Sequence, residues 1–240
     1  MLRAIFFDFG GTLMDPKSDH EAHVLLMEKI KKEFKLPLTV EQLLKKYYEA
    51  MEATESISKE LYIPALVRAE NFFKRLLVEH GIVPTKVEVK WFEKAYMESH
   101  FERVRLYPDV VEALESLSSL GIHIGVLSEA DEIYLKRQLE ELEVLHLFKS
   151  VTTSEEVGVG KPHPLLFKAA LMKAKCEASE AMHVGDSLEK DVKGAKSVGM
   201  KAVWVNRAYD HAKKPTSNNE ADYVVYTLVE LKEIVPRLML

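Results

Sequence analysis

Asp8, with the turn that follows it, is the first of several polar residues in this chain that could do chemistry. The apolar run Ala4–Phe7 predicts a fully buried strand, inside which a charge is costly. Asp8 is therefore expected at the strand's carboxyl end, where open α/β sheets bind ligands. Gly10 and Gly11 let the backbone turn sharply there. Such a carboxylate is a nucleophile or a metal ligand, and the plain alternative is a strand ending in an Asx-turn.

Three later segments also present one well-placed polar group. These are Ser128 after the apolar run 122–127, Lys161 after the loop 155–160, and Asp186 after the run 181–185, with Asp191 five residues on. In this order the four segments resemble the four motifs of the haloacid dehalogenase (HAD) superfamily of phosphohydrolases. The resemblance covers the whole chain, including the strand and helix after residue 200. It implies an α/β fold, with a parallel-sheet, Rossmann-like core and an inserted all-helical cap.

The resemblance implies that a phosphorylated substrate reacts with Asp8. Asp8 would attack the phosphorus, giving an aspartyl-phosphate that water then hydrolyses. Lys161 would neutralise Asp8 and the transferring group. The phosphoryl oxygens would be bound by side chains and backbone amides of Gly10, Gly11, Thr12, Ser128, Glu129 and Lys161.

Magnesium is the cofactor that the resemblance implies. Asp186 would bind Mg²⁺ directly, together with Asp8 and the backbone carbonyl of Gly10, because this hard cation prefers oxygen ligands. Asp191 would orient the metal shell or Lys161. Its alternative is a favourable charge near a helix N-terminus.

One position departs from the family pattern. Family phosphatases usually carry a second aspartate two residues after the nucleophile, as general acid and base, and here that residue is Gly10. Glycine keeps the carbonyl that binds metal, but it cannot deliver a proton. A positioned acid is worth about 10²–10⁴-fold in rate. Asp15 and Glu129 are the candidate replacements, and either could equally be structural.

The departure leaves other functions open. Dehalogenases of the superfamily also lack the second aspartate, but they are metal-independent and use an arginine from the early cap. No arginine occurs between Arg3 and Arg68, and the spacing Gly185-Asp186-x-x-x-x-Asp191 is retained, which argues against a 2-haloacid dehalogenase. A phosphonate hydrolase needs a cap lysine, and the cap has several. A decayed phosphometabolite-binding or regulatory module is the alternative from another class.

The elements that must position these residues fall into two regions. Residues 1–16 and 104–240 alternate short apolar strands with amphipathic helices, as in a parallel sheet. Residues 17–103 predict four helices instead, near 20–34, 40–53, 62–80 and 87–100. This insertion resembles the family's mobile cap, which closes over the sheet edge and excludes water. The enclosed substrate is therefore expected to be a small phosphorylated metabolite.

The composition of the chain limits the binding partners and the cellular compartment that we expect. Of the 240 residues, 47% are hydrophobic and 30% are charged, an ordinary globular balance. The net charge of −5 is dispersed without a basic patch, which argues against nucleic-acid binding. No apolar run reaches membrane-spanning length, and the start predicts a strand rather than a signal peptide. The single Cys176 excludes an internal disulfide and suits a reducing cytosol. We expect a cytoplasmic protein, monomeric or weakly homodimeric.

Overall fold

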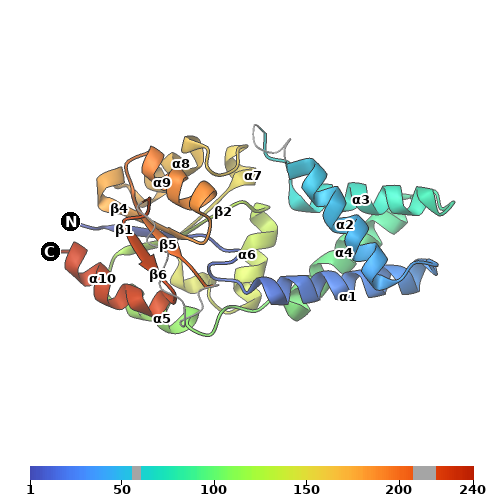
Figure 1. Cartoon of the computed structure of the whole chain (residues 1–240), viewed down its shortest axis with the longest axis horizontal. Helices are drawn as coiled ribbons and strands as arrows, with labels where there is room; N and C mark the ends of the chain where they lie inside the picture. Colours follow the sequence, from blue (N-terminus) through green and yellow to red (C-terminus); the bar gives the residue numbers. More distant parts are fainter. Residues whose placement is uncertain (56–60, 208–219) are drawn as a thin grey trace. The chain divides into compact units, whose positions relative to one another are not determined.

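The chain folds as two compact units in the computed structural model, which describes residues 1–55, 61–207 and 220–240 (Figure 1). Residues Met1–Asp15 and Leu106–Leu240 form one unit, here called the α/β unit. Residues Pro16–Arg105 form the other, here called the helical unit. In the described part of the chain, none of the helices is both long and apolar enough to span a bilayer.

A six-stranded parallel sheet is the centre of the α/β unit, in the order β3-β2-β1-β4-β5-β6. Its strands are β1 (Ala4–Phe7), β2 (His123–Ser128), β3 (Ser150–Thr153), β4 (Ala181–Gly185), β5 (Lys201–Val205) and β6 (Tyr223–Val225). The predicted α/β fold with a parallel sheet is confirmed. The prediction missed β3, because this edge strand contains one apolar residue, Val151, and so lacks an apolar run.

The strand order reverses direction between β1 and β4. The chain adds β2 and β3 on one side of β1, then returns to add β4, β5 and β6 on the other. Phe7 pairs with Val126 of β2 and with Val184 of β4, so the carboxyl ends of these three strands lie level. Open α/β sheets bind ligands at such a switch point.

Helices cover both faces of the sheet (Figure 1). On one face lie α5 (Val110–Ser118), α6 (Glu132–Glu141) and α10 (Leu231–Leu238), and on the other α8 (Pro164–Ala174) and α9 (Lys193–Ser197); the short α7 (Ser154–Val157) follows β3. Side chains of β1 alternate between the two layers: Ile5 and Phe7 pack with the first, Ala4 and Phe6 with the second. All four are fully buried, as expected of an apolar run covered on both faces.

The helical unit consists of four helices and, in its described residues, contains no strand. They are α1 (Pro16–Phe34), α2 (Val40–Glu55), α3 (Ala65–Glu79) and α4 (Lys86–Arg103). The four predicted helices are all present, but α1 begins earlier than expected, at Pro16, because proline suits a helix's first position. Aromatic packing joins α3 to α4, with the rings of Phe73 and Phe92 stacked 4.5 Å apart.

Candidate active site

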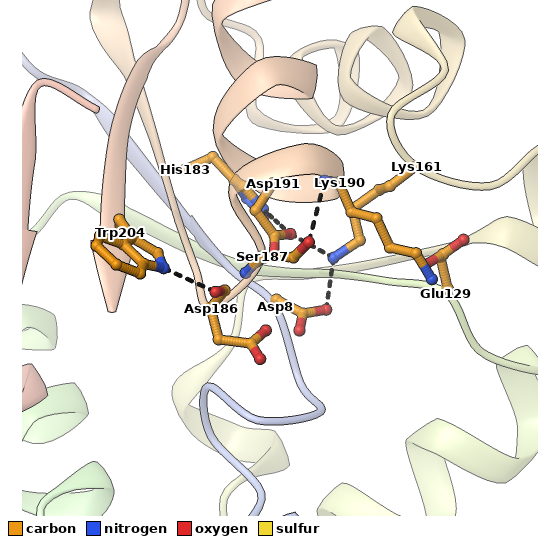
Figure 2. Close-up of polar contacts among 9 residues, drawn as sticks. All are labelled: Asp8, Glu129, Lys161, His183, Asp186, Ser187, Lys190, Asp191 and Trp204. Atoms are coloured by element: carbon orange, nitrogen blue, oxygen red, sulfur yellow. Dashed lines mark hydrogen bonds and ion pairs between the residues drawn. The ribbon is translucent and has the colours of Figure 1, made fainter. Parts of the chain in front are cut away.

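The adjacent carboxyl ends of β1 and β4 bring Asp8 and Asp186 together. Asp8 directly follows β1, and its backbone N–H donates to the Val184 carbonyl of β4 at 2.9 Å. Asp186 directly follows β4, and its carbonyl accepts from the indole Nε1 of Trp204 on β5 at 2.8 Å (Figure 2). Backbone hydrogen bonds therefore hold both aspartates in place while their carboxylates remain available.

Lys161 reaches this pair from the loop between α7 and α8. Its Nζ donates to Oδ1 of Asp8 and to Oδ1 of Asp191, each at 2.6 Å (Figure 2). The lysine side chain is only 3% exposed. Burial alone would lower the pKa of Lys161, but the charges of Asp191 and Asp8 outweigh it and hold that pKa above its usual value. The amine is therefore a permanent cation between two carboxylates.

Asp191 lies in a single π-helical turn, Leu188–Val192. Its carboxylate accepts hydrogen bonds from three donors outside that turn. Besides Lys161, His183 Nε2 donates to its Oδ1 at 2.8 Å, and the Ser187 N–H donates to its Oδ2 at 3.0 Å. Burial raises the pKa of Asp191, but Lys161 and His183 outweigh burial and keep the pKa below its usual range. Burial lowers the pKa of His183, so a neutral imidazole donates this bond.

A glycine is required beside Asp191 because of this packing. A Cβ atom at Gly185 would lie 2.1 Å from the Asp191 Cγ, far inside contact distance. The last residue of β4 must therefore lack a side chain if the Asp191 carboxylate is to reach Lys161.

The acidic groups are arranged as a cation site. Asp8, Asp186 and Asp191 each offer an oxygen, and these oxygens lie within 4.8 Å of one another. Burial raises the pKa of Asp8 to about 7 despite Lys161, and burial together with Asp191 raises the pKa of Asp186. Three carboxylates around one lysine leave an excess of negative charge. A hard divalent cation such as Mg²⁺ fits both this charge and this set of oxygen donors.

A cavity of about 350 Å³ lies over these groups and is the size of a small ligand. It is lined by Asp8, Gly10, Ser128, Glu129, Lys161, Asp186, Ser187, Lys190 and Asp191. Glu129 Oε2 pairs with Lys190 Nζ at 3.0 Å on one wall. A larger cavity of about 570 Å³ is lined by Arg3 and Glu180, which precede β1 and β4, and so lies at the opposite edge of the sheet.

Three predicted residues, Gly11, Thr12 and Asp15, do not line the cavity. The Thr12 side chain is fully buried, and its Oγ1 has no hydrogen-bond partner within the described residues. Asp15 lies instead near Tyr107, whose pKa is raised by burial and by the charge of Asp15. The phosphoryl contact of Thr12 and the acid role of Asp15 stay predictions.

The two glycines after Asp8 differ in what they require. Gly11 has φ +73°, and a Cβ there would lie 2.4 Å from Oδ2 of Asp186, so both backbone and space demand glycine. Gly10 has no positive φ, and its nearest neighbour to a Cβ would be the Met14 Cε at 3.8 Å. A Cβ atom would therefore fit at Gly10.

Sequence reasoning missed several residues that position the site. Arg207 donates from Nε and Nη2 to the Thr12 carbonyl, at 3.1 and 2.7 Å, and from Nη1 to Asp109 at 2.9 Å. Its guanidinium also lies 3.8 Å from the centre of the Tyr107 ring, so it braces the glycine turn. Nothing in the sequence around Arg207 indicates this contact. His183 did give a signal, as the polar residue within an apolar strand.

Comparisons with known proteins agree on one family. A family model described as haloacid dehalogenase-like hydrolase matches residues 2–199. The glyceraldehyde 3-phosphate phosphatase of Methanocaldococcus jannaschii is 29% identical over 99% of both chains. A solved HAD phosphatase from Thermococcus onnurineus is 28% identical, covers 98% of each chain and superposes with a TM-score of 0.73. A solved 2-haloacid dehalogenase from Pseudomonas syringae is 25% identical over 99% of each, with a TM-score of 0.76.

The first prediction concerns Asp191. Asp191→Asn keeps the shape of the side chain but removes the charge that orients Lys161, so activity should fall by roughly 10–100-fold, as for other groups that orient a site's ligands. Glu189→Gln is the matched control, because Glu189 lies in the same turn, is 71% exposed and pairs only with Lys193 among the ion pairs described. Steady-state kinetics of both variants would test this; equal activities would contradict it.

Proposed function

The chain belongs to the haloacid dehalogenase-like hydrolases, and we propose that it is a magnesium-dependent phosphatase of small phosphorylated metabolites. One observation carries the proposal: the carboxylates of Asp8, Asp186 and Asp191 lie together in a small-ligand cavity, and Lys161 pairs with those of Asp8 and Asp191. Relatives named as glyceraldehyde 3-phosphate and phosphoserine phosphatases support this substrate class. The helical unit is proposed to act as the cap that encloses the substrate.

Asp8 is the nucleophile in this proposal. Lys161 binds its Oδ1, so we assign Oδ2 to the attack on phosphorus. The attack forms an aspartyl-phosphate as the ester oxygen leaves, and water then cleaves the acyl-phosphate to regenerate Asp8. Lys161 offsets the charge that develops on the phosphoryl oxygens, while Ser128, at the carboxyl end of β2, hydrogen-bonds one of them.

Mg²⁺ would be held by the carboxylates of Asp8 and Asp186 and the carbonyl of Gly10. When bound, it supplies positive charge that lets anionic Asp8 meet an anionic phosphate. The chain's own contribution is to bury two of the three carboxylates: Asp8 is 7% exposed, and Asp191 is 1% exposed and fixes Lys161 rather than the substrate.

Protonation of the leaving group is the step for which no donor is obvious. Gly10 has no side chain to provide it, and Asp15 does not line the cavity. Glu129 does line it and is therefore the replacement that we favour, although its carboxylate pairs with Lys190.

Dehalogenation is the second candidate because one similar solved structure is a 2-haloacid dehalogenase. Metal dependence separates the two reactions, since the acidic cluster needs a cation to approach a phosphate. The activity on p-nitrophenyl phosphate should vanish in a chelator and return with Mg²⁺. Hydrolysis undiminished by the chelator, or halide release from a 2-haloacid without metal, would overturn the phosphatase proposal.

A catalytically decayed binding module is separated from an enzyme by Asp8 itself. Asp8→Asn should abolish turnover because an amide is a poor nucleophile, while the circular dichroism spectrum stays that of the wild type. The wild-type carboxylate should also capture beryllofluoride, as seen in the fluorine-19 spectrum. Tight binding of phosphometabolites by wild type without any turnover would favour the binding module.

Because Gly10 supplies no acid, the rate of hydrolysis should depend steeply on the leaving group. Nitrophenolate or an acyl carboxylate departs as a stable anion, so aryl and acyl phosphates should be cleaved far faster than sugar phosphates. Gly10→Asp should raise sugar-phosphate turnover by part of the general-acid factor of about 10²–10⁴, because the backbone at Gly10 accepts a Cβ atom without a clash. Gly10→Asn, equal in shape but without an acid, is the matched control.

Equal rates of wild type on the sugar phosphate and the aryl ester would show that another acid already acts. In that case Glu129→Gln and Asp15→Asn identify it, because loss of the true donor slows the sugar phosphate and spares the aryl ester.

A further inference from the structure

A second group of potential metal ligands lies wholly within the helical unit. Asp19 and His23 stand four residues apart on α1, which places them on one helix face, and His100 meets them from α4. Each offers one ligand atom, and these atoms lie within 4.8 Å of one another. None of the three takes part in the proposed hydrolysis.

Both histidines turn one ring nitrogen toward the same carboxylate. His23 Nδ1 lies 3.6 Å from Asp19 Oδ2, and His100 Nε2 lies 3.8 Å from Asp19 Oδ1. These separations are too long for hydrogen bonds. The two distances end at different oxygens of Asp19, and one ligand atom from each of the three residues lies within 4.8 Å of the others.

The opposite ring nitrogens are held by oxygens. His100 Nδ1 lies 2.7 Å from the Tyr96 carbonyl, which can only accept, so Nδ1 carries the proton and a neutral ring has its lone pair on Nε2. His23 Nε2 lies 3.1 Å from the Tyr47 hydroxyl, while its Nδ1, the proposed ligand atom, lies 3.4 Å from the Tyr48 hydroxyl, a contact that a bound ion would replace. A ring nitrogen fixed by an oxygen is the usual support of a metal-binding histidine, because it sets the tautomer and the ring orientation.

The three ligand residues differ in their exposure. The His23 and His100 side chains are 9% and 3% exposed. The Asp19 side chain is 34% exposed, which leaves a route from solvent for an ion.

We propose that Asp19, His23 and His100 bind one Zn²⁺-class transition-metal ion that joins α1 to α4. Two imidazole nitrogens and one carboxylate suit zinc and its neighbours rather than Mg²⁺, which prefers oxygen ligands. Three protein ligands leave the fourth position to water. The site is thus distinct in chemistry from the all-oxygen cluster at Asp8.

The position of the site suggests what the ion does. Asp19 follows closely after Pro16, the unit's first residue, and His100 shortly precedes Arg105, its last residue. These two ends are already tied together, since the Arg105 N–H donates to Ser18 Oγ at 2.9 Å. A bound ion beside them stabilises the helical unit at the point where the chain enters and leaves it.

Cobalt(II) is the probe, added to the full-length protein in excess Mg²⁺. A site with two nitrogen ligands and low coordination number gives visible absorption bands, whereas an all-oxygen octahedral site absorbs weakly. One equivalent should bind with such bands and be displaced by Zn²⁺. His100→Gln and Asp19→Asn should each weaken binding by more than the roughly 10–100-fold that loss of an outer hydrogen-bond partner costs a metal site.

His20→Gln is the matched control, because His20 neighbours the cluster but is exposed and is not one of the three proposed ligands. It should bind cobalt as wild type does. The proposal is overturned if wild type shows no visible bands, or if all three variants bind the ion equally well. In either case Asp19, His23 and His100 form a buried polar network rather than a metal site. Phosphatase assays are not needed for this test, so it is independent of the function proposed above.

Discussion

The site is organised by one buried cation, the Lys161 amine held between the carboxylates of Asp8 and Asp191. Removing charges from water is costly unless they are paired and hydrogen-bonded, so each of these groups is stable in its place only because the others are there. The two carboxylates that hold Lys161 need further contacts of their own. Asp191 needs His183 and the Ser187 amide, and Asp8 is fixed through its backbone to Val184.

The sheet topology makes this pairing available. Reversal of strand order between β1 and β4 puts Asp8 beside Asp186, and the π-helical turn after β4 brings Asp191 back toward Lys161. π-turns are rare and often occur at functional sites, because the extra residue redirects side chains. Gly185 belongs to the same device, since any side chain there would occupy the position of the Asp191 carboxylate.

The two consecutive glycines after Asp8 differ in whether the fold requires them. Gly11 is required by its positive φ and by Asp186, so it belongs to the architecture. Gly10 has neither constraint, and its lack of an acid is a property of the chemistry rather than of the fold. Arg207 holds the turn through two hydrogen bonds to the Thr12 carbonyl, which involve no side chain at residue 10.

Local residue pattern was enough to predict the α/β fold, the four helices of the inserted unit and the strand ends at which the polar residues gather. Apolar runs and glycines act over a few neighbours, so they are readable along the chain. The same reading missed β3, because three of its four residues are Ser or Thr and so give no apolar run, although Val151, Thr152 and Thr153 are buried in the fold. Tertiary structure alone decided that Thr12 and Asp15 lie off the cavity and that Arg207 braces the turn. It alone also brought His100 to Asp19 and His23, because those contacts join segments far apart in sequence and depend on how the elements pack.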